Sequence, residues 1–592
     1  MGHDMMENLA RASSLGALLR QHASERADQD AAVFVRGPQT GDAHTLTYAQ
    51  LDRRASGIAR ALRARAALGD RVLLLYPQGT ECVEAFAGCL YAGMPAVVAP
   101  MPGSYQQDRK RVTSIVRDTR VSIVLTDAAN LETVRDWAES TGIPDLTVLA
   151  SDTFEDADGA SEPLAPADRS TTAMLQYTSG STSDPKGVEV THGNLLHDIA
   201  AIAHAFGATE PVRTGGWAPL YHDLGLIAQT LLPLAMGSTV VLMSAISFVK
   251  RPYQWLKLVD TYDLEFSAAP NFAFQLCTEK VTDEQLATLD LSRWRYALSG
   301  AEAVQVSTMR KFTRRFAAAG LRPDAFGACY GLAESTVFVS GATRREQVVA
   351  ELDAAALERG ELRRAAPGRP SRALPSNGPV WDLEARIVDP GNHREQPDRT
   401  VGEIWLRGES VARGYWGNPE ATAEVFQAYT EDGDGPFLRT GDLGAFLDGE
   451  LYVTGRRKDL MIINGRNLHP QDIEYALRDH HAELDGLPGA VFTVPAGEEG
   501  ELQDEALIVL QEVRGRPSPD RAEALVRTMR DTLSREFGVR AAGVLLVRRA
   551  GVQRTTSGKV QRAAMRELFL SGAIDPLFAE FDTRFTERGR AA

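Results

Sequence analysis

The feature that most constrains the fold is an alternation of short apolar runs with amphipathic segments early in the chain. Apolar runs at 71–76, 96–99 and 122–126 predict buried strands. Residues 80–92 and 107–119 lie between these runs and predict helices. Parallel strands need long crossovers, usually helical, and strand–helix–strand repeats supply them. The sequence therefore predicts an α/β protein with helices layered on parallel sheets.

Length, composition and charge favour a multidomain enzyme. The 592 residues are 44% hydrophobic and 24% charged, which is typical of a globular protein and excludes intrinsic disorder and a fibrous fold. At roughly 150 residues per domain, the length suggests about four structural units. The net charge of −15 repels nucleic-acid backbones, so we expect no nucleic-acid partner.

Cysteine usage and the N-terminus favour a reducing compartment. The four cysteines are scattered and form no C-x-x-C pair, which argues against a disulfide framework and against zinc. Asp4 and Glu7 lie where a signal peptide would be basic. The uncharged stretches 85–102 and 224–249 are interrupted by Gly and Pro, and we interpret them as buried helix–turn–strand units. We expect a cytoplasmic monomer with no stable membrane insertion.

The pattern changes twice in the second half of the chain. From Glu384 onward, short strands alternate with turns, which predicts a small β-rich subdomain over residues 384–454. A charged cluster at 456–459 then precedes a compact stretch of mixed strands and helices. We predict a large N-terminal domain over residues 1–457 and a small α+β C-terminal domain over residues 458–592.

The sharpest local signal is the segment YTSGSTSDPKG at residues 177–187. Its small residues let the backbone wrap closely around a phosphate, its hydroxyl and N–H groups donate to phosphate oxygens, and Lys186 adds positive charge. A Walker A loop would instead continue from Gly-Lys through Ser or Thr into a helix, whereas residues 188–191 form a strand-like run. This disfavours a P-loop phosphotransferase. Taken alone, the segment also fits a polar hairpin.

Seven motifs occur in one order along nearly the whole chain, and together they resemble the adenylate-forming superfamily of acyl ligases, adenylation domains and luciferases. Fatty acyl-AMP ligases are the most similar branch, because of phrases such as YHDLGLI and NGRNLHPQDIE at residues 221–227 and 464–474. The seven motifs are LTYAQL at 46–51, the loop 178–187, SGAE at 299–302, YGLAE at 330–334, RTGD at 439–442, GRRKD at 455–459 and TTSGK at 555–559.

An additional segment at residues 342–367 follows YGLAE and corresponds to the insertion that distinguishes this branch from acyl-CoA ligases. Taken alone, this segment also fits a surface helix and loop. The resemblance implies the adenylate-forming fold, a large α/β domain followed by a small C-terminal domain that rotates about a hinge at Lys458. The insertion would disfavour the closure needed for free coenzyme A.

The resemblance also assigns roles to site residues. Two anions must meet when a carboxylate approaches the α-phosphorus of ATP, so the site needs positive charge and good alignment. Lys559 would neutralise these groups, His222 would lie where they meet, and Glu334 would hold Mg²⁺. Tyr330 would stack on adenine, and Asp442 would accept the ribose hydroxyls. The other residues implied to bind the nucleotide are Thr178, Ser179, Gly180, Ser181, Thr182, Lys186, Gly300, Ala301, Glu302, Gly331 and Arg456.

The implied reaction is ATP- and Mg²⁺-dependent activation of a medium- or long-chain fatty acid to acyl-adenylate, with release of pyrophosphate. The acyl group would then pass to the phosphopantetheine thiol of an acyl carrier protein. We expect residues 224–249 and 272–274 to line the acyl tunnel. An acyl-CoA ligase is the nearest alternative. A non-catalytic nucleotide-binding protein of the same fold is a second one, against which the full set of charged motif residues argues.

Overall fold

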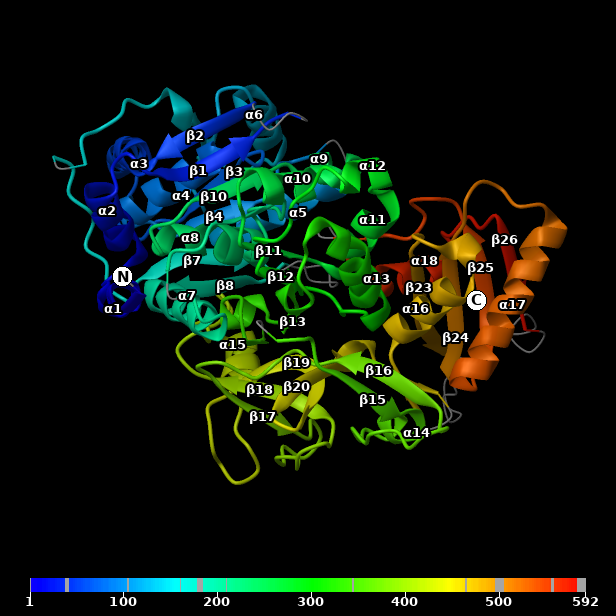
Figure 1. The fold of residues 1–592 in the computed structure, drawn as a ribbon. Helices are drawn as coiled ribbons and strands as arrows, with labels where there is room; N and C mark the ends of the chain where they lie inside the picture. Colours follow the sequence, from blue (N-terminus) through cyan, green and yellow to red (C-terminus); the bar gives the residue numbers. More distant parts are fainter. Residues whose placement is uncertain are drawn as a thin grey trace.

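The computed structural model describes residues 2–37, 42–103, 106–159, 161–177, 185–208, 210–342, 345–463, 466–495, 505–554 and 558–582. Two large sheets, each covered by helices, form the first part of the chain. A β-rich subdomain and a C-terminal unit follow, and the C-terminal unit lies to one side of the rest (Figure 1). The predicted α/β architecture is confirmed.

A six-stranded sheet is built from the alternating segments near the start of the chain. Its strand order is β6-β5-β3-β4-β7-β8, and β8 alone runs antiparallel to its neighbour. The predicted strands and helices in this region match the observed ones to within a residue. The bounds are β3 Val72–Leu75, α4 Thr80–Ala92, β4 Ala96–Ala99, α5 Gln106–Thr119, β5 Ile123–Thr126, α6 Leu131–Ser140, β6 Thr147–Ala150, β7 Thr172–Tyr177 and β8 Gly187–Thr191.

An eight-stranded sheet has the order β14-β13-β12-β11-β9-β10-β1-β2, parallel except for its two edge strands. The strands are β1 Asp30–Val35, β2 Ala43–Thr47, β9 Thr214–Gly216, β10 Val240–Met243, β11 Phe266–Ala269, β12 Tyr296–Ser299, β13 Phe326–Tyr330 and β14 Ser340–Gly341. The helices of this part are α1 Gly2–Arg11, α2 Leu15–Glu25, α3 Tyr48–Arg63, α7 His192–Ala205, α9 Ala245–Lys250, α10 Tyr253–Thr261, α11 Asn271–Lys280, α12 Asp283–Leu286 and α13 Val306–Phe316.

Helix α4 contacts strands of both large sheets and is part of the core that joins them. All of its residues except Glu81 are buried. A helix that is apolar on every side must be buried on every side, which explains the first uncharged stretch without a membrane. Within the described residues, the structure contains no helix long and apolar enough to span a bilayer.

The second uncharged stretch folds into a helix and a strand, as predicted, but its helix begins in an unexpected form. Residues Leu224–Leu231 make a π-helix, η2, which continues into α8 at Leu232–Ala235. The Thr230 hydroxyl donates to the Gly225 carbonyl five residues earlier, at 2.8 Å. Such wide turns are rare and are often found at functional sites.

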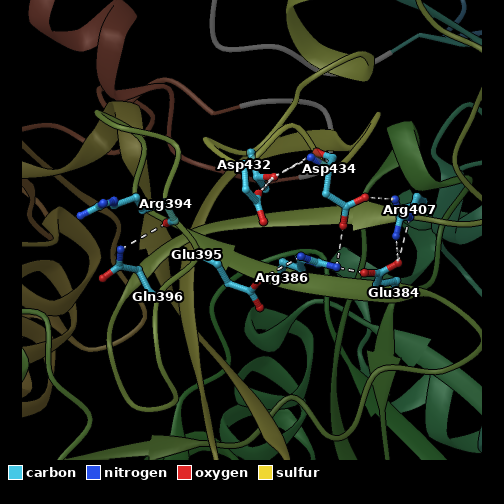
Figure 2. A network of polar contacts seen from close by, with 9 residues as sticks. Glu384, Arg386, Arg394, Glu395, Gln396, Arg407, Asp432 and Asp434 are labelled. Atoms are coloured by element: carbon cyan, nitrogen blue, oxygen red, sulfur yellow. Dashed lines mark hydrogen bonds and ion pairs between the residues drawn. The ribbon is translucent and has the colours of Figure 1, made fainter.

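The β-rich subdomain is an antiparallel sheet of β17 Glu384–Val388, β18 Gly402–Arg407, β19 Leu438–Leu447 and β20 Glu450–Arg456. Helix α15 Pro419–Phe426 lies between β18 and β19 in the sequence and contacts β19. Figure 2 shows a polar network that ties its edge to a nearby loop. Glu384 accepts from Arg386 and Arg407, each at 2.8 Å, and Asp434 pairs with both arginines at 2.7 and 2.8 Å. These pairs connect the edge strand β17 to β18 and to the loop that contains Asp434.

The segment predicted as a family insertion contains β15 Val349–Asp353 and α14 Ala354–Glu358. Strand β15 pairs antiparallel with β16 Ser371–Pro375, so the segment is part of a small two-stranded sheet. This is more ordered than a surface helix and loop, because Leu352 and Leu362 form a small core with residues of β19 and β20.

The C-terminal unit has its own sheet, in the order β23-β24-β25-β26, and its own apolar cores on both faces of that sheet. Strand β24 runs parallel to β25, and the other pairs are antiparallel. A unit with separate cores can move as one body. Its elements are β21 Met461–Ile463, β22 Arg466–Leu468, α16 Pro470–His480, β23 Gly489–Pro495, β24 Glu505–Glu512, α17 Pro519–Phe537, β25 Ala541–Val547, α18 Arg562–Leu570 and β26 Phe578–Phe581.

Candidate active site

A cavity of about 1300 Å³ lies where the large sheets, the β-rich subdomain and the C-terminal unit meet. Several parallel strands end at it, and the residues that follow them, such as Trp217, Pro270 and Gly300, line its wall. Ligands of open α/β sheets bind at this place, beyond the carboxyl ends of the strands. Tyr475 and Lys559 contribute to the wall from the C-terminal unit.

Asp442 joins the residues of one wall of the cavity, which we call the Asp442 wall and define as Tyr330, Asp442 and Arg456. It lies on β19 opposite Arg456 on β20, and the register of this antiparallel pair brings the two charges to 3.2 Å. Asp442 also accepts a hydrogen bond from the Tyr330 hydroxyl at 2.8 Å. Asp442 raises the pKa of Arg456, and burial raises the pKa of Tyr330 well above its usual range. The wall thus presents an aromatic ring beside a carboxylate and a guanidinium.

Gly300 and Gly331 let the backbone approach closely at this wall. A Cβ on Gly300 would lie 2.6 Å from the Cys329 sulfur, and one on Gly331 would lie 1.7 Å from the Val337 carbonyl oxygen. Ala301 has a positive φ of 61° and also lines the cavity. These contacts explain why small residues occupy the positions.

The Glu302 side chain lines the cavity and also contacts the first turn of α11. Its carboxylate accepts from the Phe272 backbone N–H at 2.6 Å, so it caps the first turn of that helix. Burial raises the pKa of Glu302, whereas the cations Arg478, Lys559 and Arg554 oppose this shift. Its carboxylate therefore faces cations of the C-terminal unit, in the same cavity as the Asp442 wall.

Lys186 and Glu334 are joined through Tyr415. The Lys186 ammonium lies 4.7 Å from the centre of the Tyr415 ring, and the Tyr415 hydroxyl donates to Glu334 at 2.8 Å. Burial raises the pKa of Glu334, while the Tyr415 hydroxyl and the Arg456 charge oppose this shift. The backbone of Trp416 donates to Gly187 at 2.8 Å, which fixes the end of the phosphate loop.

His222 and Asp223 follow Tyr221 at the entrance to η2. The His222 Nδ1 atom lies 2.5 Å from the Asp223 carboxylate. Burial acts to raise the pKa of Asp223, but the neighbouring His222 and Lys559 charges and the Leu224 N–H outweigh burial and lower it. Asp223 is thus held ionised, where it orients the imidazole toward the cavity residues.

Lys559 reaches the cavity from a loop between β25 and α18. Burial lowers the pKa of this lysine, and the Arg456 charge lowers it further, whereas Asp223 and Glu302 raise it. Gly558 beside it has a φ of +89°, and a Cβ there would lie 3.2 Å from the Phe272 ring. The loop is therefore packed against α11, and the lysine charge lies among the site carboxylates.

An apolar arm of the cavity is formed by α7, η2 and the strands β11 and β12. The Phe206 ring centre lies 5.6 Å from that of Phe266 and 5.7 Å from that of Phe338. A surface of this kind buries an alkyl chain, at about 0.8 kcal/mol for each methylene group. We define the apolar arm by its lining residues: Ile202, Phe206, Leu224, Ala228, Phe266, Leu298, Val337 and Phe338.

The predicted tunnel lining is correct in part. Leu224, Ala228, Ala245, Val249 and Phe272 line the cavity. The prediction that residues 273 and 274 do so is wrong. Ala273 and Phe274 are fully buried in a different core, where the Phe274 ring packs against aromatic rings that include Trp255 and Phe312.

The remaining predicted residues belong to the phosphate loop and to the expected hinge. Thr178, Ser179, Gly180, Ser181 and Thr182 lie outside the described residues, although Tyr177 and Lys186 on either side of them line the cavity. Lys458 lies in a short turn at Arg457–Asp459 and also lines the cavity. Burial lowers the pKa of Lys458. Its function as a hinge stays a prediction.

Two residues of this region were missed in the sequence: Arg111 lines the cavity, and Tyr415 contacts the lining residues Lys186 and Glu334. Tyr415 connects Lys186 to Glu334, and its only signal was an aromatic pair between glycines at 414–417. Arg111 lines the cavity from α5, and its only signal was a run of basic residues at the start of a predicted amphipathic helix. Neither pattern indicates a site by itself.

The cavity combines a wall of aromatic and charged side chains with an apolar arm. The sequence of residues 19–416 matches the family model described as AMP-binding enzyme. The chain therefore belongs to the AMP-binding enzyme family and, by the relatives that follow, to its fatty-acid–AMP ligases. Enzymes of this family use ATP.

Two relatives and one solved structure illustrate the likeness. A medium-chain-fatty-acid–[acyl-carrier-protein] ligase, JamA, of Moorena producens is 38% identical, over 95% of this chain and 96% of the relative. A long-chain-fatty-acid–AMP ligase, FadD26, of Mycobacterium marinum is 37% identical, over 95% and 98%. The crystal structure of a fatty acid AMP ligase from Legionella pneumophila has a TM-score of 0.74 at 34% identity, over 97% of this chain and 98% of that one.

Proposed function

We propose that this enzyme activates a medium- or long-chain fatty acid as its acyl-adenylate and then transfers the acyl group to the phosphopantetheine thiol of an acyl carrier protein. One observation carries the proposal: the apolar arm opens into the same cavity as Lys559, His222 and the Asp442 wall. A fatty acid in the apolar arm would therefore bring its carboxylate among the cations. The relative JamA, a medium-chain-fatty-acid–[acyl-carrier-protein] ligase, supports the carrier protein as acceptor.

In the first step, a carboxylate oxygen of the fatty acid attacks the α-phosphorus of ATP. The bond from that phosphorus to the bridging oxygen breaks, and pyrophosphate leaves with the bonding electron pair. The Lys559 ammonium offsets the charge of the attacking carboxylate and of the α-phosphate, and the Asp223–His222 pair holds the imidazole at the same place. Preorganised charges of this kind act more strongly in a cavity than in water.

Glu334 is the residue that fits a magnesium ion. Mg²⁺ is usually bound through one or two carboxylates together with substrate phosphates. One Glu334 oxygen accepts from Tyr415, and Lys186 lies against the same ring. Within the described residues there is no group of three or more candidate metal ligands. When bound, the ion would offset phosphate charge and orient the nucleotide.

Replacing Glu334 with Gln should raise the Mg²⁺ concentration needed for half-maximal acyl-AMP formation by at least about tenfold, because a charged ligand is lost. The measurement is a magnesium titration of the initial rate at saturating ATP. Glu420→Gln, an exposed change at the start of α15, is the control. An unchanged magnesium requirement in Glu334→Gln would remove Glu334 from this function.

The proposed acid substrate is tested by fatty-acid-dependent exchange of labelled pyrophosphate into ATP. We expect exchange with straight-chain acids of about eight to sixteen carbons and little with acetate, because each buried methylene adds about 0.8 kcal/mol. Equal exchange with acetate and dodecanoate would contradict the function proposed for the apolar arm. The cytoplasmic location and monomeric state stay predictions from the sequence.

Contacts of the insertion and of its pairing strand β16 with the C-terminal unit support a carrier protein over coenzyme A as acceptor. Arg466 on β22 donates to Glu358 on α14 at 2.8 Å. Arg372 on β16 donates to Asp472 on α16 at 2.7 Å, and its guanidinium lies 5.3 Å from the centre of the Phe537 ring. These pairs hold the C-terminal unit in the position that brings Lys559 into the cavity. Breaking them should therefore ease the rotation expected for the second step.

The double variant Glu358→Gln/Arg372→Gln should form acyl-CoA roughly tenfold faster than the wild type, because two partly buried pairs are worth about 1 kcal/mol or slightly more in total. The measurement is single-turnover transfer from preformed acyl-AMP to coenzyme A. Arg364→Gln is the matched control, since its pair with Asp448 lies at 2.8 Å within the N-terminal part. An unchanged transfer rate in the double variant would show that these contacts do not select the acceptor.

A further inference from the structure

Arg111 is a cation in the cavity that the mechanism above does not use. It lies in the second turn of α5, next to Val112, whose side chain is fully buried in the core under the six-stranded sheet. Arg111 itself is only partly exposed and lines the cavity. Its neighbour Lys110 is exposed. Only one of these adjacent cations therefore faces the site.

The described surroundings of Arg111 provide no direct ion pair for its charge, although Asp108 lies near enough to act on it. Among the described residues, no carboxylate lies within 4.0 Å of its guanidinium. Burial lowers the pKa of Arg111, and the nearby Tyr221 and Asp108 groups only partly oppose this. A partly buried guanidinium without an ion pair is unfavourable unless an anion joins it. The arrangement therefore favours an anionic ligand.

The position of Arg111 identifies the part of the substrate it would meet. The Tyr177 hydroxyl donates to Asp118 on α5, which ties this helix to the strand end where the phosphate loop begins. Gln176 donates to the Tyr221 carbonyl at 2.9 Å. Tyr221 precedes His222 in the sequence, and Tyr177 pairs with Gly187, the residue after Lys186. Gln176, Tyr177 and Tyr221 all line the cavity. Arg111 thus shares the wall of Lys186, on the side of the cavity formed by the six-stranded sheet.

Binding of the adenylate part of the substrate is assigned to other residues of the cavity. The Tyr330–Asp442–Arg456 group on the β-rich subdomain side carries the features expected for the nucleoside, and the reacting groups meet at His222 and Lys559. Lys186 is the cation assigned above to the phosphates, although most of the negative charge of ATP departs with the leaving group. Guanidinium groups bind phosphates through two parallel N–H donors, which makes arginine suited to this task.

We propose that Arg111 binds the β- and γ-phosphates of ATP and, after the α-phosphorus bond breaks, the pyrophosphate leaving group. This inference rests on the adenylation reaction proposed above. Arg111 is then a binding residue for one product alone, because acyl-adenylate lacks both phosphates. Its loss should affect ATP and pyrophosphate and leave the affinity for acyl-adenylate unchanged.

The test compares Arg111→Gln with wild type in the forward reaction and in ATP synthesis from acyl-AMP and pyrophosphate. We expect the KM for pyrophosphate and the KM for ATP to rise about 10- to 100-fold, the value of a charge-assisted pair. Arg111→Lys should recover part of this loss, and Lys110→Gln should behave as wild type. Binding of an acyl-sulfamoyl adenosine, which mimics acyl-AMP, should not change and serves as the control for folding.

The outcomes separate this inference from the reaction on which it rests. A wild-type protein that forms no acyl-AMP contradicts the proposed function. An active wild type with unchanged pyrophosphate and ATP KM values in Arg111→Gln contradicts the assignment of Arg111. Weaker binding of the acyl-sulfamoyl adenosine by the variant would also contradict it, since it would place Arg111 at the adenylate.

Discussion

Replacing Lys559 with Ala should slow acyl-AMP formation by about 100- to 1000-fold, the loss typical when one preorganised charge is removed from a transition state. The lysine charge lies among Asp223, Glu302 and Asp442 in a partly buried position, where solvent screens it less than it would at the surface. The measurement is single-turnover formation of acyl-AMP from ATP and dodecanoate. Transfer from preformed acyl-AMP to a carrier thiol should be much less affected.

Arg549→Ala is the matched control, because it removes an exposed cation from the same C-terminal unit. Thermal unfolding of both variants should follow the wild type. Full adenylation activity in Lys559→Ala would mean that the cavity acts without this charge, and the mechanism would then be wrong at its central residue. A variant that loses both half-reactions equally would indicate a folding defect.

Replacing Asp442 with Asn should raise the KM for ATP about 10- to 100-fold, because Asp442 supports two other groups of the nucleotide wall. It accepts from Tyr330 at 2.8 Å and pairs with Arg456 at 3.2 Å. An amide of the same shape loses the charge that holds the guanidinium in place. The measurement is the ATP dependence of acyl-AMP formation.

Asp448→Asn is the control for this change. Asp448 follows β19 in the same sheet but is half-exposed and pairs with Arg364 outside the cavity. Surface pairs of this kind contribute little to stability. If both variants raised the KM for ATP equally, the effect would come from the sheet as a whole and the specific function of Asp442 would be contradicted.

Local patterns in the sequence were enough for the framework of the fold. The strands and helices between residues 71 and 126 were predicted to within a residue, because each is short, strongly apolar on its inner side and bounded by turn residues. The π-helix at Leu224–Leu231 was not predicted. A segment that is apolar all round shows no period from which its pitch could be inferred.

The site was harder to predict because its contacts join distant parts of the chain. The hydrogen bond from Tyr415 to Glu334 spans 81 residues, and that from Tyr330 to Asp442 spans 112. Motif resemblance supplied Glu334, Tyr330 and Asp442 but had no pattern for Tyr415. The error at Phe274 has a geometric cause. It lies two positions after Phe272 on α11, so the two side chains point to different sides of the helix.

The identity of the thioester product tests the central claim most directly. The purified enzyme would be incubated with ATP, Mg²⁺ and labelled dodecanoate, alone, with coenzyme A, and with a phosphopantetheine-bearing carrier protein. We predict that acyl-AMP accumulates in the first two reactions and that the label moves to the carrier protein in the third. Efficient formation of acyl-CoA would contradict the carrier-protein assignment, and the absence of acyl-AMP in all three would contradict adenylation itself.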